Sequence, residues 1–262
     1  MVNYDTNGNL VDSYSYQSDS AGNIVKSNRN SKESLYKYDG LNQLLEVSKP
    51  DKILEKYFYD TLGNRVRLET WKNGTYRYSA DSKYDNLDRL TQVTGKGFNV
   101  LGNDEYTPHG INLYYDERGN IVEASTDKTK IQQFTFDASN RLVQAINKKG
   151  EKSTFTYDGF GRRVGMTYDV NPSENIVAEL SYLHDVTKPY DNVLAIFGAN
   201  VDEKNRQYTY GLEMLSEDTT RQEGSANRLY YLHDELGSPI KLVDEAGLVG
   251  ANFEYDVGAH FN

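Results

Sequence analysis

Short segments in which polar and apolar residues alternate make up most of the chain. Residues 55–59 are rich in β-forming aromatic residues, with Tyr57 and Tyr59 on one strand face, and residues 64–68 alternate strictly. A period of two is typical of a half-buried strand. No segment keeps a helical period beyond two turns. The pattern therefore predicts an all-β fold of stacked antiparallel hairpins.

A recurring phrase of tyrosine, aspartate, two variable residues and glycine separates the paired segments. In Tyr59-Asp60-Thr61-Leu62-Gly63, the Asp60 carboxylate is placed to accept hydrogen bonds from backbone N–H groups that follow it. Gly63 stands where the chain must enter the left-handed region to rejoin a twisted strand, and glycine does this without steric cost. The phrase therefore predicts a hairpin turn with structural roles for both residues.

Some copies carry asparagine or aspartate where the others have glycine, at Asn42, Asp88 and Asn140. These are the non-glycine residues that best tolerate a left-handed conformation, which supports the turn assignment. The residues expected to build the repeat turns are Tyr4, Asp5, Gly8, Tyr38, Asp39, Tyr59, Asp60, Gly63, Tyr84, Asp85, Tyr115, Asp116, Gly119, Phe136, Asp137, Tyr157, Asp158, Gly161, Asp234, Gly237, Asp244, Gly247, Tyr255 and Asp256.

The spacing of the copies predicts a repeat protein. Tyr38 and Tyr59 are 21 residues apart, as are Phe136 and Tyr157, which is room for two strands and two turns. Such short units bury a face only by stacking on their neighbours. We expect a single β-array over 1–262, with regular repeats in 1–169 and a variant segment in 170–262. The wider gap between residues 84 and 115 predicts a surface loop.

Composition narrows the functional classes. A net charge of −10 argues against a broad nucleic-acid surface, and zero cysteines exclude disulfides and cysteine chemistry. There is no apolar run of transmembrane length and no signal peptide at the N-terminus, and the chain opens inside a repeat phrase, which suggests a piece of a longer protein. Low hydrophobicity (37 %) together with 22 tyrosines fits a thin sheet that is wet on both faces.

No catalytic, cofactor-binding or metal-binding residues are expected. Residues 5–9 resemble part of a calcium loop but lack the spacing and distal glutamate of an EF-hand. In His184-Asp185 and His233-Asp234, adjacent strand residues point to opposite faces, so both pairs are interpreted as variant turns rather than catalytic dyads. His109 and His260 have no partner motif, and Ser238 lacks the G-x-S-x-G nucleophile elbow.

The phrase and its 21-residue step resemble the YD repeat of the RHS family. Residues 208–212, 230–239 and 244–247 resemble, in order, the stretch that precedes the C-terminal motif of the RHS core. The resemblance implies a curved β-ribbon that is part of a hollow shell, as in bacterial polymorphic toxins, insecticidal toxin complexes and teneurins. Such shells enclose a C-terminal toxin domain. The chain stops before the aspartates used for self-cleavage, so that activity is assigned to no residue here.

From this resemblance we expect a structural, non-enzymatic segment of a secreted or cell-surface bacterial toxin shell that acts in bacterial competition. Its expected partners are the rest of the shell and a C-terminal cargo domain, with no nucleic acid and no membrane segment. Unpaired sheet edges favour self-association. Two alternatives remain open: an adhesion module that binds carbohydrate or a protein through exposed tyrosines, and a hydrolase, for which no nucleophile motif is present.

Overall fold

A computed structural model describes residues 2–4, 7–96, 110–171, 176–188, 191–199, 205–220, 226–234 and 237–253. Over these residues the chain forms twenty-two β-strands and one 3-10 turn, so the predicted all-β class is confirmed. Among them, no helix is long and apolar enough to cross a membrane. The residues divide into two compact units, the first within 1–114 and 125–128 and the second within 115–124 and 129–254.

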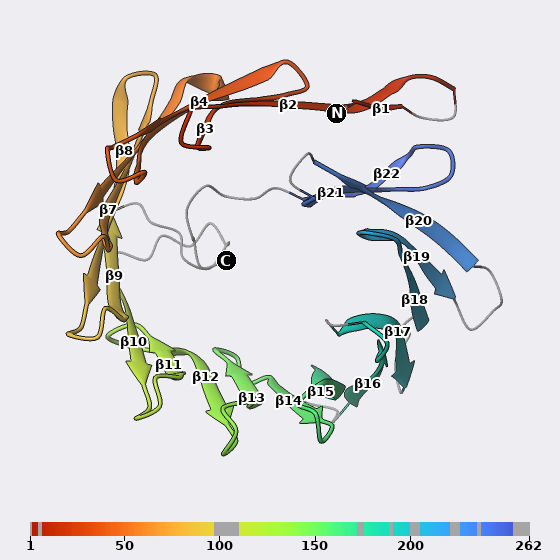
Figure 1. The fold of residues 1–262 in the computed structure, drawn as a ribbon. Coiled ribbons are helices and arrows are strands. Elements are labelled where there is room, and N and C mark those ends of the chain that lie inside the picture. The colour runs from red at the N-terminus through yellow and green to blue at the C-terminus, as the bar shows by residue number, and fades with distance from the viewer. Residues whose placement is uncertain are drawn as a thin grey trace. The chain divides into compact units, whose positions relative to one another are not determined.

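The first unit is a run of hairpins in sequence order. Its elements are β1 (Val2–Tyr4), β2 (Leu10–Ser18), β3 (Ile24–Arg29), β4 (Lys32–Tyr38), β5 (Leu44–Lys49), the 3-10 turn (Pro50–Lys52), β6 (Ile53–Tyr59), β7 (Arg65–Lys72), β8 (Thr75–Tyr84), β9 (Leu90–Lys96) and β10 (Ile111–Tyr115). Each strand pairs antiparallel with the next, from β1 through β10. The result is a single curved sheet in which every connection joins neighbouring strands (Figure 1).

The second unit repeats this plan. Its strands are β11 (Ile121–Ser125), β12 (Lys130–Phe136), β13 (Leu142–Asn147), β14 (Lys152–Tyr157), β15 (Arg163–Asn171), β16 (Ile176–Asp185), β17 (Asn192–Ala199), β18 (Asn205–Tyr210), β19 (Met214–Thr220), β20 (Ala226–His233), β21 (Pro239–Val243) and β22 (Val249–Asn252). From β12 to β22 each strand again pairs antiparallel with its successor (Figure 1).

The two faces of the sheet differ, and one of them carries the buried apolar cluster of the first unit. In the first unit, Val47, Tyr57 and Leu68 form a buried cluster to which Tyr59 adds its ring. The pairing register places Lys37 opposite Glu46 on the other face. There, Nζ of Lys37 donates to Oε1 of Glu46 at 2.6 Å. Successive side chains of a strand point to opposite faces, which places the cluster on one face and the Lys37–Glu46 pair on the other. This single layer explains the low hydrophobic content.

Candidate functional site

The aspartates of the recurring phrase organise the turns along one edge of each unit. The backbone N–H groups of Leu62 and Asn64 both donate to Oδ1 of Asp60, at 2.9 Å each. The N–H of Gly63 donates to the main-chain oxygen of Asp60 at 3.2 Å. The same pair of backbone bonds to a carboxylate forms along this edge at Asp19, Asp39, Asp85, Asp116, Asp137 and Asp158, and at the opposite edge at Asp244. These carboxylates therefore fix loop geometry.

The fourth residue of each turn adopts a left-handed backbone. Gly63 has φ 90° and Gly161 has φ 87°, and where glycine is absent Asn42, Asp88 and Asn140 have φ 61°, 57° and 60°. Glycine pays no steric penalty there, whereas asparagine and aspartate carry a side chain into the turn. The remaining predicted turn glycines with positive φ are Gly8, Gly119, Gly237 and Gly247.

In several repeats a tyrosine at the end of the strand before the turn ties its hairpin to the preceding one. The hydroxyl of Tyr59 donates to the main-chain oxygen of Leu44 at 2.8 Å, and that of Tyr84 donates to Arg65 at 2.9 Å. In each case the acceptor is the first strand residue after the preceding turn. Burial raises the pKa of both phenols. Equivalent bonds run from Tyr38 to Ile24, from Tyr157 to Leu142 and from Tyr210 to Val193.

Neighbouring turns in the first unit are also joined side chain to side chain. Asn23, which follows a glycine turn, donates from Nδ2 to Oδ1 of Asn42 in the next turn at 2.8 Å. Asn64 donates in the same way to Oδ1 of Asp88 at 3.0 Å. Glycine has no acceptor to offer, so these bonds require asparagine or aspartate at the left-handed position. Asparagine or aspartate at this position therefore links neighbouring turns, which glycine cannot do.

Glycine turns and asparagine or aspartate turns alternate along this edge in the first unit, and the alternation recurs at Gly119, Asn140 and Gly161 of the second unit. There, Asn120 donates to Oδ1 of Asn140 at 3.1 Å. In the first unit, a Cβ added at Gly63 would lie 3.0 Å from Nε2 of Gln43, which extends from the preceding turn. The asparagine and aspartate turns thus receive a hydrogen bond, and the glycine at residue 63 leaves room for the side chain of Gln43.

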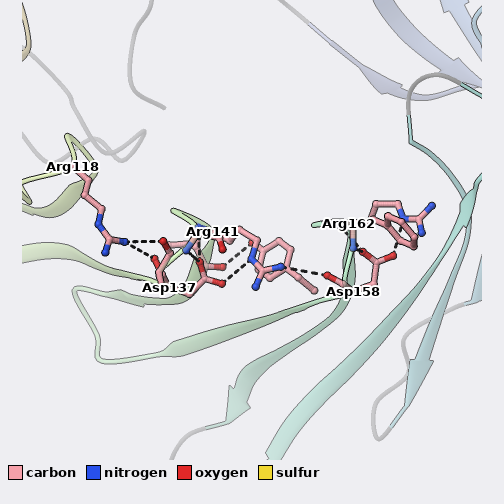
Figure 2. A network of polar contacts seen from close by, with 10 residues as sticks. Arg118, Asp137, Arg141, Asp158 and Arg162 are labelled. Atoms are coloured by element: carbon pink, nitrogen blue, oxygen red, sulfur yellow. Dashed lines mark hydrogen bonds and ion pairs between the residues drawn. The ribbon is translucent and has the colours of Figure 1, made fainter.

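Figure 2 shows how the second unit extends these links into one chain of polar contacts. Nη1 of Arg118 donates to the main-chain oxygens of Asp137 and of the next residue, at 3.2 and 3.1 Å. Arg141 binds its own turn through Nε to Oδ2 of Asp137 at 2.7 Å, and it reaches the following turn through Nη1 to the main-chain oxygen of Asp158 at 3.3 Å. Arg162 then binds Oδ2 of Asp158 at 2.7 Å. Three successive turns are thereby fixed relative to one another.

These bonds favour the ionised form of the carboxylates of Asp85, Asp116 and Asp137. The side-chain hydrogen bond from Arg89 holds the pKa of Asp85 below its ordinary value, and that from Asn120 does the same for the pKa of Asp116. The backbone N–H and then the guanidinium of Arg141 lower the pKa of Asp137. The charged form is the one that the loop N–H groups and arginines bind, so the row of turns is fully assembled at neutral pH.

The two described histidines lie at the ends of strands β16 and β20, just before the turns that follow. Nε2 of His184 donates to the main-chain oxygen of Arg163 at 2.7 Å, which places His184 where other copies have tyrosine. Asp185 accepts from the backbone of Thr187 at 2.8 Å. His233 lies with Nδ1 3.4 Å from a carboxylate oxygen of Glu213. In the His184-Asp185 pair, the ring and the carboxylate thus bind different groups.

The opposite edge has more varied turns, part of which the sequence analysis missed. Asn30 and Ser31 form a two-residue turn with φ 49° and 64°, as do Asn73 and Gly74 with φ 53° and 73°. Oδ1 of Asn147 accepts the backbone N–H groups two and four residues on, at 3.0 and 3.1 Å, as an aspartate would. The signal was present in the sequence, because 147–150 is the recurring phrase with asparagine in place of aspartate.

Buried carboxylates lie on the sheet itself, a second feature that sequence reasoning did not anticipate. Asp12 is fully buried, and its Oδ2 accepts the hydroxyl of Tyr14 at 3.0 Å and lies 3.5 Å from the guanidinium of Arg29. Burial, followed by this hydrogen bond, raises the pKa of Tyr14. Similar couples join Tyr57 to Glu55, which also binds Lys49, and Tyr231 to Glu217. Each carboxylate is paired, which suits a structural role.

Five residues of the sequence predictions lie outside the described part of the chain: Asp5, His109, Tyr255, Asp256 and His260. Residues 97–109 of the predicted loop between 84 and 115 lie outside it as well, whereas β9 and the start of β10 occupy much of the rest. Within the described part, no group of three or more His, Cys, Asp or Glu side chains could hold a metal ion. The candidate functional site is therefore the row of linked turns, whose polar groups hold neighbouring hairpins together.

Comparison with known proteins identifies a family and several proteins to which this chain is similar. The family model described as Teneurin YD-shell matches residues 2–258. The chain is 28 % identical to the tRNA3(Ser)-specific nuclease WapA of Bacillus spizizenii, over 84 % of this chain and 8 % of that protein. It is 27 % identical to Teneurin-4 of Homo sapiens, over 95 % of this chain and 8 % of that protein. The crystal structure of TcdB2-TccC3-Cdc42 shares the fold, with a TM-score of 0.58 and 14 % identity over 97 % of this chain and 15 % of that one.

Proposed function

Because the chain belongs to the Teneurin YD-shell family, we propose that it is a wall segment of a larger shell that separates an enclosed cargo domain from solvent. The supporting observation is the double set of links between hairpins, through tyrosine hydroxyls within the sheet and through turn side chains along its edge. A single layer with a thin core needs such links to stay closed against water and proteases.

The sizes of the relatives support a non-enzymatic role for this segment. The chain matches 8 % of a protein named as a tRNA nuclease and 15 % of a chain from a toxin complex. We propose that the shared part holds a toxic domain, while the catalytic residues lie elsewhere in such proteins. The buried polar groups in this chain fit that role, because Asp12 and Glu55 are neutralised by partners within the sheet.

Limited proteolysis of the longer polypeptide that carries this segment tests the proposal. The triple variant N64A/N120A/R141A, called the breach variant, removes links between turns. The matched variant K37A/E46A removes an ion pair from the sheet face opposite the buried cluster. We expect the breach variant to release fragments of the C-terminal domain several-fold faster than wild type, and the matched variant to behave as wild type. Equal cleavage in all three proteins would refute enclosure by this wall.

An assay of the isolated chain tests the absence of catalysis separately. Purified chain is incubated with tRNA, double-stranded DNA, ester and peptide substrates, and we expect no turnover above buffer. Turnover that a single substitution of a described aspartate or histidine abolishes would overturn the non-enzymatic assignment, whatever the proteolysis shows.

A further inference from the structure

A hollow lies on one face of the second unit, where two small residues stand between two rings. The pairing register aligns Phe134 with Ala145, Ala145 with Ser153, and Ser153 with Tyr168, in one row across β12 to β15. Residues paired in this way point to the same face of a sheet. The hollow has a volume of about 280 Å³, and Met166 lines it together with this row.

The first unit fills the equivalent place with its own side chains. Its corresponding row, which also starts two residues before the end of a strand that leads into an asparagine turn, consists of Tyr36, Val47, Glu55 and Thr70. Val47 is fully buried, and Glu55 is 5 % exposed. Oε1 of Glu55 accepts from Nζ of Lys49 at 2.7 Å, and Oε2 accepts from the hydroxyl of Tyr57 at 2.6 Å. A cation, an anion and a hydroxyl thus close this part of the face.

The second unit lacks every member of that polar group. At the equivalent positions Asn147, Ser153 and Phe155 stand where the first unit has its lysine, glutamate and tyrosine. Ala145 replaces the buried valine, and both Ala145 and Ser153 are only half-buried. Because the charged pair and the phenol are replaced together, no buried charge is left there in need of a partner. The hollow therefore suits an apolar group.

We propose that this hollow binds one aromatic side chain of an extended peptide. An apolar cavity of about 150 Å³ is enough to hold a benzene ring, so the space is sufficient. The rings of Phe134 and Tyr168 and the thioether of Met166 each interact better with an aromatic ring than with an aliphatic chain of similar area. Gln132 and Ser153 bring an amide and a hydroxyl to the lining, which suit the peptide groups on either side of the ring.

The charges around the hollow favour an uncharged occupant. The charged residues at its rim are Glu151, Lys152 and Asp169, with Lys148 and Lys149 in the adjoining turn. Oε2 of Glu151 accepts from the side-chain amide of Asn147, and Oδ2 of Asp169 accepts from the backbone N–H of Lys152 at 2.8 Å. A basic side chain would approach three lysines, and an acidic one would approach two carboxylates. A neutral ring avoids both.

Methionine-methyl NMR measures binding at this place, because Met166 lines the hollow and Met214 lies elsewhere in the same unit, on β19. In the wild-type chain, N-acetyl-phenylalaninamide should shift the Met166 methyl resonance saturably, with a dissociation constant of about 1 mM for a ligand of this size. N-acetyl-leucinamide, which lacks the ring, and benzyl alcohol, which lacks the peptide groups, should each bind at least about threefold more weakly. The Met214 resonance should stay in place.

Two variants separate filling of the hollow from a general change in the sheet. A145V/S153V adds methyl groups inside the hollow and should weaken binding at least about tenfold. The matched variant T135V/T156V places the same side chain at two exposed positions on the opposite face of β12 and β14, and it should bind as wild type. A Met214 resonance at its wild-type position shows that the second unit of each variant is folded.

The single variant A145V, which copies Val47, gives the same test with a smaller change and should weaken binding at least about threefold. Three results would overturn the proposal: no saturable shift of Met166 up to about 10 mM N-acetyl-phenylalaninamide, unchanged binding to both filled variants, or tighter binding of N-acetyl-argininamide than of the phenylalanine probe. Equal affinity for benzyl alcohol and N-acetyl-phenylalaninamide would refute the peptide as the occupant.

Discussion

The hydrogen bond between Asn64 and Asp88 is the sharpest test of the idea that alternating turns hold one another. Its donor and acceptor lie 3.0 Å apart on turns whose strands are joined only through β7 and β8. The perturbation is a double-mutant cycle of N64A, D88G and the combined variant. Glycine is chosen because Asp88 has φ 57°, which glycine adopts freely, so the backbone is not strained by the change.

The magnitude follows from the environment of the bond. A hydrogen bond to a charged acceptor contributes about 1.5–3 kcal/mol, but exposure at the turn reduces this to about 1 kcal/mol. The D88G change alone has two opposite effects on the free energy of unfolding, each of about 1 kcal/mol. It removes the strain of the left-handed conformation, and it gives the unfolded chain more conformational freedom. The two effects largely cancel. We therefore expect a coupling energy of about 1 kcal/mol, with D88N, which keeps an acceptor oxygen, close to wild type.

Urea denaturation followed by Trp71 fluorescence provides the assay, because this single tryptophan lies on β7, one of the two strands between the turns, and reports unfolding of that hairpin. With an m-value of about 2 kcal/mol/M, the coupling corresponds to about 0.5 M in the midpoint. A coupling below about 0.3 kcal/mol, or a D88N variant as unstable as D88G, would show that the bond is a by-product of turn packing. Trp71 reports on the first unit only, so an analogous cycle on Asn120 and Asn140 should be followed by circular dichroism.

Three further outcomes follow from the same geometry. The variant G161A should lose about 1–2 kcal/mol because alanine is strained at φ 87°, and G63A should lose more because its Cβ would also meet Gln43; equal losses in chemical denaturation would contradict the crossing of Gln43 over Gly63. The variant V47A should lose about 2–3 kcal/mol, since Val47 is fully buried in the cluster with Tyr57 and Leu68, and a loss under 1 kcal/mol would mean that the site collapses around the cavity. Stability should fall at both pH extremes. The pKa values of Asp19, Asp85 and Asp116 are lowered in the fold, so their contribution is present above about pH 4 and is lost as pH falls through the folded values. The pKa values of Tyr59, Tyr84 and Tyr210 are raised, so their contribution is present below about pH 10 and is lost as pH rises beyond it; melting temperatures that stay flat from pH 2 to 12 would refute both assignments.

The sequence predicts what is local in this fold. The all-β class and the family follow from alternation and from one phrase, because the Asp60 carboxylate and Gly63 act within five residues of each other. The bonds between turns were not foreseen, because Asn64 and Asp88 are 24 residues apart and meet only once strand registers are set. Asp12 was equally hidden, since an acidic residue in an alternating segment is ordinarily assigned to solvent.

The alternation of the turns also bears on how such an array can gain or lose repeats. Loss of one repeat, which carries one turn of this edge, would bring two turns of the same kind side by side. An Asn64-like donor would then face a glycine, or two left-handed Asn or Asp side chains would adjoin with no donor between them. Loss of two successive repeats would again place each donor beside an acceptor in the neighbouring turn. We therefore expect viable length variants to differ by even numbers of repeats, so that the inherited unit is a pair of turns rather than the phrase itself.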